Sequence, residues 1–286
     1  MKQKVNDLNS PDNTPELPGT ELSGTDLPVM GQAAALMNDT APGAAAATGL
    51  RLQVYLSHAG VASRRNAEQI ILEGRVTVNG SVVTGMGSRV QEDDIVCVDG
   101  ARIQKETYKR YVLLNKPSGY VCSLADEKGR PIAADILKNN YAERLYNIGR
   151  LDMYSAGALL FTNDGQFASI VGHPSAEIEK EYIVEASLPF RDEVVEAFSK
   201  GIRVDNVFYK CREAERLSSR RMRIVLIEGK NREIRKVFEH FGIRIKNLIR
   251  VRIGPVSLGD IKYGEFRDLT ADEISALMAA KEEEIS

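Results

Sequence analysis

The sequence has 286 residues, of which 43% are hydrophobic and 27% charged, a composition typical of a globular chain of about two domains. It contains no apolar run near the roughly 20 residues of a membrane-spanning helix, and its polar start, Met1-Lys2-Gln3-Lys4, lacks the form of a secretory signal. The three cysteines and three histidines are scattered, which argues against a disulfide framework or a metal site. We therefore expect a cytoplasmic protein that uses neither a membrane nor a metal.

The formal net charge of −2 conceals a segregation of charge along the chain. Both ends are acidic, with net charges of −4 over 1–49 and −5 over 260–286. The stretch 211–252 instead carries thirteen Lys and Arg against five Glu. An excess of this size favours a polyanion partner over an ordinary solvated face.

Residues 1–49 hold five of the ten prolines, an alanine run and no aromatic side chain. Such a composition buries too little apolar surface to offset the entropy of ordering. We expect a disordered tail, to which the sequence assigns no function.

The next segment, 50–99, predicts a small domain that starts with two helices. Residues 51–56 have the pattern of a short amphipathic helix. Ser63 is a favourable N-cap for a second helix, in which Arg64 and Arg65 occupy the first turn.

A β-hairpin and a further strand complete this domain. Asn79-Gly80 lies between two β-branched runs, the pattern of a type I′ turn, and 94–98 predicts a strand. Two helices followed by such a sheet resemble the S4 RNA-binding domain. The resemblance implies phosphate contacts, for which the alternative is plain surface solubility, at four residues: Ser63, Arg64, Arg65 and Arg75.

A polar linker over 100–109 precedes the second domain, 110–269, which we expect to be followed by a C-terminal helix and tail over 270–286. The domain opens with a strand that ends at the turn Lys116-Pro117-Ser118-Gly119. A lysine in a turn is usually just exposed, so Lys116 is not counted among the catalytic candidates.

The centre of the second domain is an apolar run, 158–161, bracketed by polar residues, which predicts a buried strand. Arg150 and Asp152 precede it two residues apart, so an extended backbone places both side chains on one face. There they can pair, which keeps the carboxylate ionised and oriented. A purely structural salt bridge is the commoner reason for such a spacing.

This segment, from Gly149-Arg150-Leu151-Asp152 to Thr162-Asn163-Asp164-Gly165, closely resembles the signature of the pseudouridine synthases that modify ribosomal RNA. Ser155 stands where that family has Thr, and Ala158 where Leu is usual. The resemblance implies that Asp152 is the catalytic carboxylate, either a nucleophile at the sugar or a base that removes a sugar proton. It also implies that Arg150 helps to place Asp152.

A second segment, 180–184, resembles another motif of the same family. Alternation places Lys180 and Tyr182 on one face of a predicted strand, where a lone Tyr is usually a core residue. The resemblance implies instead that Tyr182 stacks on a flipped base and that its hydroxyl assists proton transfer.

The third motif, 228–236, predicts a helix capped by Asn231. Arg232 lies in its first turn, where a cation opposes the helix dipole, which suggests an anionic partner, either RNA phosphate or Asp152. The resemblance implies that a basic residue of this motif lies beside the aspartate; Arg232 is the expected one and Lys230 the alternative. Further RNA contacts are expected at five residues: Lys180, Lys230, Arg235, Lys236 and Arg250.

Together the motifs imply an α+β protein: a small S4-like α/β RNA-binding domain, then a catalytic domain with a mixed, mostly antiparallel sheet and flanking helices. The implied activity is that of an RNA pseudouridine synthase, an isomerase that needs no cofactor and acts on a uridine flipped out of ribosomal RNA, with large-subunit RNA favoured. We expect a monomer. The alternative is a non-catalytic S4-type RNA-binding or ribosome-assembly protein, in which Arg150 and Asp152 form only a structural pair.

Overall fold

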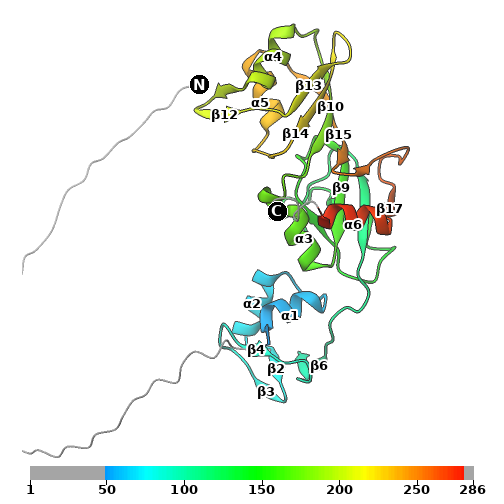
Figure 1. Ribbon diagram of the computed structural model, residues 1–286. Coiled ribbons are helices and arrows are strands. Elements are labelled where there is room, and N and C mark those ends of the chain that lie inside the picture. Colours follow the sequence, from blue (N-terminus) through cyan, green and yellow to red (C-terminus); the bar gives the residue numbers. More distant parts are fainter. Residues whose placement is uncertain (1–48, 280–286) are drawn as a thin grey trace, which may run out of the picture. The chain divides into compact units, whose positions relative to one another are not determined.

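The computed structural model describes residues 49–279. The predicted disordered tail, apart from Gly49, and residues 280–286 lie outside the described residues. Two domains follow one another along the chain (Figure 1), and each has its own hydrophobic core. Within 49–279, no helix combines the length and the apolar character needed to cross a membrane.

The first domain contains two helices and short strands, as the sequence predicts. Its elements are β1 (Leu50–Arg51), α1 (Leu52–His58), α2 (Arg64–Leu72), β2 (Val76–Val78), β3 (Ser81–Val82), β4 (Arg89–Val90), β5 (Val96–Val98) and β6 (Ala101–Arg102). A four-stranded sheet has the order β3-β2-β5-β6, and β1 pairs with β4. Because β6 belongs to this sheet, the domain continues beyond residue 99, where we expected it to end.

Local signals read from the sequence account for this domain. The Ser63 Oγ accepts a hydrogen bond from the Asn66 backbone N–H at 3.2 Å, so Ser63 is the N-cap of α2. Asn79 and Gly80 have φ angles of 51° and 82°, the positive values that a type I′ turn requires. The hairpin and the capped helix enclose a single apolar core.

The second domain is built on one mixed sheet. Its elements are β7 (Tyr111–Lys116), η1 (Ala133–Ile136), β8 (Tyr146–Ile148), β9 (Ala156–Thr162), α3 (Gly165–Gly172), η2 (Pro174–Ala176), β10 (Lys180–Ala186), α4 (Asp192–Lys200), β11 (Ile202–Val204), β12 (Val207–Tyr209), β13 (Glu213–Arg216), β14 (Arg221–Leu226), α5 (Glu233–His240), β15 (Ile245–Ile253), β16 (Val256–Ser257), β17 (Phe266–Asp268) and α6 (Ala271–Ala279). The sheet runs β13-β14-β10-β15-β9-β7-β17, with β16 beside β15 and β8 beside β9. The predicted mixed, mostly antiparallel sheet is confirmed.

The strand β9 is the centre of this domain because both of its faces are buried. Leu159 and Phe161 belong to the core cluster that includes residues of α4 and α5. Ala158 and Leu160 belong to a second cluster, which includes residues of α3 and α6. A strand covered on both faces has no room to shift, so the loop that precedes it is held at a fixed place.

The one parallel pairing in the described sheet, between β9 and β15, depends on a glycine. Gly157 lies opposite Arg250 in this pairing and has a φ of 106°. A Cβ at this position would lie 2.1 Å from the Arg250 carbonyl oxygen, closer than any side chain permits. Gly157 therefore lets the two strands meet, which brings residues of β15 to the loop that carries Asp152.

Candidate active site

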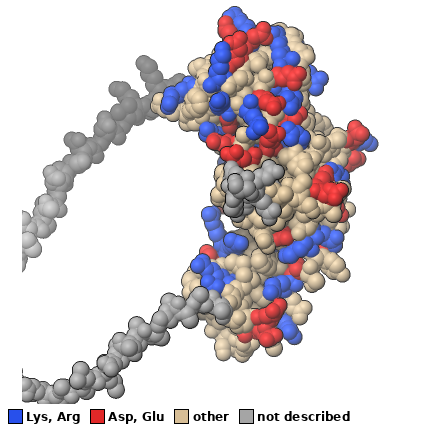
Figure 2. All heavy atoms as spheres, viewed as in Figure 1, with Lys and Arg blue, Asp and Glu red and all other residues tan. Residues whose placement is uncertain are grey.

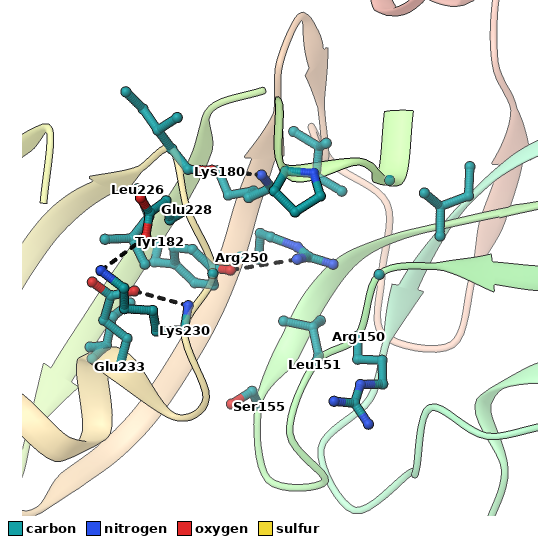
Figure 3. A pocket seen from close by; sticks show the side chains of 18 of the residues that line it. Arg150, Leu151, Ser155, Lys180, Tyr182, Leu226, Glu228, Lys230, Glu233 and Arg250 are labelled. Carbon is teal, nitrogen blue, oxygen red and sulfur yellow. Dashed lines mark hydrogen bonds and ion pairs between the residues drawn. The ribbon is translucent and has the colours of Figure 1, made fainter. Parts of the chain in front are cut away.

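The predicted catalytic residues line one cavity of about 530 Å³. Its walls come from the loop before β9, from the neighbouring strands β10 and β15, and from the start of α5. Asp152, Tyr182, Arg235 and Arg250 all face this cavity. Figure 3 shows Tyr182 and Arg250 pointing toward each other from their two strands, with Arg150 and Ser155 on the loop opposite.

Asp152 is held in a tight turn, and its side chain is partly open to solvent. The Ser155 backbone N–H donates to the Asp152 carbonyl oxygen at 3.0 Å. The carboxylate Oδ2 lies 3.4 Å from Nε of Arg235, with the two side chains 33% and 13% exposed. Nε makes no hydrogen bond of regular geometry within the described residues, so the attraction between the two charges is the main interaction of the pair.

Arg235 also fixes the shape of the loop between β8 and β9, residues 149–155, which we call the catalytic loop. Its Nη2 donates to the Tyr154 carbonyl oxygen at 2.9 Å and to the Ser155 Oγ at 3.1 Å. Burial lowers the pKa of this guanidinium, and the charge of Asp152 opposes that effect. One side chain from α5 thus neutralises the carboxylate and ties down the residues that follow it.

The position of Arg235 corrects the prediction for Arg232. Arg232 pairs with Glu239 at 3.1 Å on the exposed side of α5. The prediction failed because α5 begins at Glu233, one residue later than a cap at Asn231 would require. Arg232 is itself the N-cap, with a φ of 52° in the left-handed region. Lys230, the alternative, pairs with Glu228 at 2.9 Å.

The predicted pairing of Arg150 with Asp152 is also wrong. The segment between β8 and β9 is a loop rather than an extended strand, so alternation does not bring the two side chains together. Arg150 is exposed at the cavity rim and has no ion pair among residues 49–279.

Lys116, which the sequence argument set aside, is completely buried behind the catalytic loop. Its Nζ donates to the carbonyl oxygens of Pro117, Tyr120 and Met153 at 2.8, 2.9 and 3.3 Å. Burial lowers its pKa to about 8, and the nearby charges of Cys122 and Asp152 act in the opposite direction. The sequence shows that Lys116 lies directly before Pro117, where β7 ends, but it does not show whether the Lys116 side chain is exposed or buried.

Tyr182 lies against Arg250, its register partner on the neighbouring strand. The Arg250 Nη1 is 3.5 Å from the Tyr182 hydroxyl, and its Nε donates to the Ala158 carbonyl oxygen at 2.7 Å. Both side chains are more than nine-tenths buried. Lys180, on the same face of β10, donates to the Ile227 carbonyl oxygen, and burial lowers its pKa to about 8.

Glu233, at the first position of α5, is a further titratable group of the cavity that the sequence argument missed. Its side chain is buried and accepts a hydrogen bond from the Lys230 backbone N–H at 3.1 Å. Burial raises its pKa to about 7. Nothing in the sequence distinguished this Glu from an ordinary first-turn acid.

Most cations of the basic stretch 211–252 are paired with acidic side chains in the fold. Figure 2 shows Lys and Arg interleaved with Asp and Glu over this part of the surface. Eight of its thirteen Lys and Arg form ion pairs. The described structure leaves five of them without an ion pair: Arg220, Arg221, Lys236, Arg244 and Arg250.

The four residues expected to contact phosphate in the S4-like domain differ in whether their side chains already have partners. Arg64 and Arg65 are exposed and have no ion pair within the described part of the chain, so both are available for phosphate. Arg75 instead contacts Asp99 at 2.6 Å and Glu73 at 3.2 Å. The Ser63 hydroxyl is used as the helix cap.

Comparisons with known proteins agree with this site. The RNA pseudouridylate synthase family matches residues 110–240, and the S4 domain matches 50–96. A Borreliella burgdorferi protein described as an uncharacterized RNA pseudouridine synthase is 37% identical over 81% of this chain and 94% of its own. The ribosomal large subunit pseudouridine synthase B of Bacillus subtilis is 38% identical over 80% of this chain and 96% of its own.

A solved structure described as a pseudouridylate synthase covers 80% of this chain and 100% of its own, with a TM-score of 0.59 and 27% identity. The chain belongs to the RNA pseudouridine synthase family and carries an N-terminal S4 domain. The resemblance inferred from the sequence motifs is confirmed, and the protein is an RNA-modifying isomerase with an RNA substrate.

Proposed function

We propose that this protein converts a uridine of large-subunit ribosomal RNA to pseudouridine in the cytoplasm, as a monomer. Relatives named for the large ribosomal subunit support this RNA. The observation that carries the proposal is the Asp152–Arg235 pair, which sits at the wall of a cavity that also contains Tyr182.

The reaction exchanges one bond to the sugar for another. The bond from N1 of uracil to C1′ breaks, the base turns, and C5 bonds to C1′. The proton on C5 is lost and N1 gains one, so atoms and electrons balance without a cofactor. Because N1 and C5 are inaccessible within a stacked helix, the nucleotide must leave the stack and enter the cavity.

Each residue has a role in this scheme. Asp152 acts at the sugar, either as a nucleophile at C1′ or as a base toward a sugar proton. Arg235 keeps the carboxylate ionised and oriented. Tyr182 presents its ring to the base and its hydroxyl to the proton transfer at C5, beside Arg250. Arg150 is exposed at the rim, and its proposed role is to occupy the space that the flipped nucleotide leaves.

The RNA is held by contacts outside the cavity as well. We assign phosphate contacts to Arg64 and Arg65, which are exposed and unpaired in the described structure, with Ser63 and Arg75 as minor contributors. Lys180 and Lys230, which line the cavity, and Lys236 on α5 remain candidates for RNA contacts.

The test is purified Asp152→Asn with RNA from cells that lack the protein. Release of tritium from uridine labelled at C5 reports the reaction, because the C5 proton is lost. Asp152→Asn should abolish release while its RNA affinity stays near wild type. A near wild-type rate for Asp152→Asn would overturn the catalytic role of Asp152. A wild-type protein that releases no tritium would overturn the proposed activity, and this is the result expected of a non-catalytic assembly factor.

A further inference from the structure

A second hollow borders the catalytic loop at Tyr154. It has a volume of about 540 Å³ and shares Arg235 with the active-site cavity, whereas Tyr182 does not line it. Its walls come from the turn after β7, the catalytic loop, the end of α5 and the start of β15, through residues that include Ser118, Tyr154, Glu239, Gly242, Arg244 and Lys246. The two cavities therefore share Arg235 as a lining residue.

Tyr154 has an exposed aromatic ring at this hollow, on a backbone that is held by hydrogen bonds. The ring is 68% exposed and makes no hydrogen bond or aromatic contact within the described structure. Its backbone is fixed: the Tyr154 carbonyl oxygen accepts from Arg235, and the neighbouring Met153 carbonyl oxygen accepts from the Gly119 N–H at 2.8 Å. An exposed aromatic ring on a fixed backbone is a stacking platform that requires little ordering on binding.

The charges around Tyr154 favour a nucleic-acid backbone. Arg244 is exposed and is one of the few cations of its stretch without an ion pair in the described chain. Among the described residues, Lys246 forms an ion pair with Glu185 alone. Both side chains of this pair are at least one-third exposed, so the pair contributes little. The acid of the hollow, Glu239, is already occupied by Arg232.

We propose that this second hollow is a subsite for the nucleotide adjacent to the target uridine, whose base stacks on Tyr154 while its phosphate contacts Arg244. The proposal rests on the proposed function, since the target uridine occupies the cavity of Asp152. Asp152 and Tyr154 are two positions apart in the chain, so their Cα atoms lie at most about 7 Å apart, and consecutive nucleotides reach both. Stacking of the adjacent base on Tyr154 also accounts for how an unpaired strand is kept open beside the flipped base.

The sequence makes this subsite directly measurable because the chain contains no tryptophan. Tyr154→Trp keeps a stacking ring and introduces a single fluorophore, which a stacked base quenches. The probe is large-subunit ribosomal RNA purified from cells that lack the gene. We expect fluorescence to fall as this RNA is added. The matched control is Tyr263→Trp, at an exposed ring that lines neither cavity, and it should remain unquenched.

Affinity measurements give a second, independent result. Tyr154→Ala should weaken RNA binding about fivefold or more, and Tyr154→Phe should bind as wild type, because the ring rather than the hydroxyl is used. Arg244→Gln should reduce the slope of log affinity against log salt by about one. Arg203→Gln, at an exposed arginine outside both cavities, should leave the slope unchanged.

Neither readout requires turnover, so the two proposals can fail separately. Unquenched Tyr154→Trp in a protein shown by anisotropy to have bound the RNA would overturn the subsite, even if Asp152→Asn is inactive. Quenching equal at positions 154 and 263 would overturn it as well. Specific quenching in a protein that forms no pseudouridine would leave the subsite standing and refute the proposed function.

Discussion

Replacing Arg235 tests the arrangement of the site most sharply, because sequence reasoning favoured Arg232. At an effective dielectric constant of about 20, unit charges 3.4 Å apart attract by about 5 kcal/mol. The Asp152 side chain is 33% exposed, so solvent screening reduces this to roughly half. Arg235→Gln should therefore slow the reaction by about 2 to 3 kcal/mol, or ~100-fold in rate.

The assay is single-turnover tritium release from C5-labelled uridine, with unfolding measured in parallel. Arg235→Lys should restore only part of the rate, because an ammonium cannot hold Asp152, Tyr154 and Ser155 together. The control is Arg232→Gln, whose exposed pair with Glu239 contributes little; its rate should stay within about twofold of wild type. Equal losses from the two glutamine variants would refute the geometry described here.

Three further changes probe other parts of the account. Tyr182→Phe should keep RNA affinity but slow tritium release by about 100-fold; an unchanged rate would remove the hydroxyl from the mechanism. Burial raises the pKa of Glu233 in the folded protein to about 7. The folded state is therefore favoured while this carboxyl is protonated, and that stabilisation is lost as pH rises through about 7. The gain in unfolding free energy of Glu233→Gln over wild type should thus be larger at about pH 8 than at about pH 4, and a flat difference would contradict this. Gly157→Ala should destabilise the fold by ~2 kcal/mol or more in chemical denaturation, because the added Cβ clashes with the Arg250 backbone. The control is Gly229→Ala, which has open space around it and should change the unfolding free energy by less than about 1 kcal/mol. Similar effects at both glycines would contradict the close pairing of β9 with β15.

Local signals in the sequence predicted the elements well. The capping Ser63, the Asn79-Gly80 turn and the doubly buried run of β9 are decided by neighbouring residues, and each is found as expected. Asp152 and Tyr182 were singled out through motifs, and the fold brings both to one cavity.

The sequence could not predict contacts between distant chain segments or the first residue of a helix. The start of α5 decides whether Arg232 or Arg235 faces Asp152, and helix ends are uncertain by a residue or two from pattern alone. Whether Lys116 is buried depends on chain segments distant in the sequence. The parallel pairing that brings Arg250 beside Gly157 joins residues more than ninety positions apart, and no local pattern specifies it.

The central claim is that Asp152 converts one uridine of large-subunit ribosomal RNA to pseudouridine. The most direct measurement maps pseudouridines by mass-shifting chemical labelling in ribosomal RNA from cells that lack the protein, complemented with either wild type or Asp152→Asn. The account predicts that a large-subunit site is unmodified in the deleted cells, restored by wild type and not restored by Asp152→Asn. Restoration by Asp152→Asn, or an unchanged pattern in the deleted cells, would contradict it.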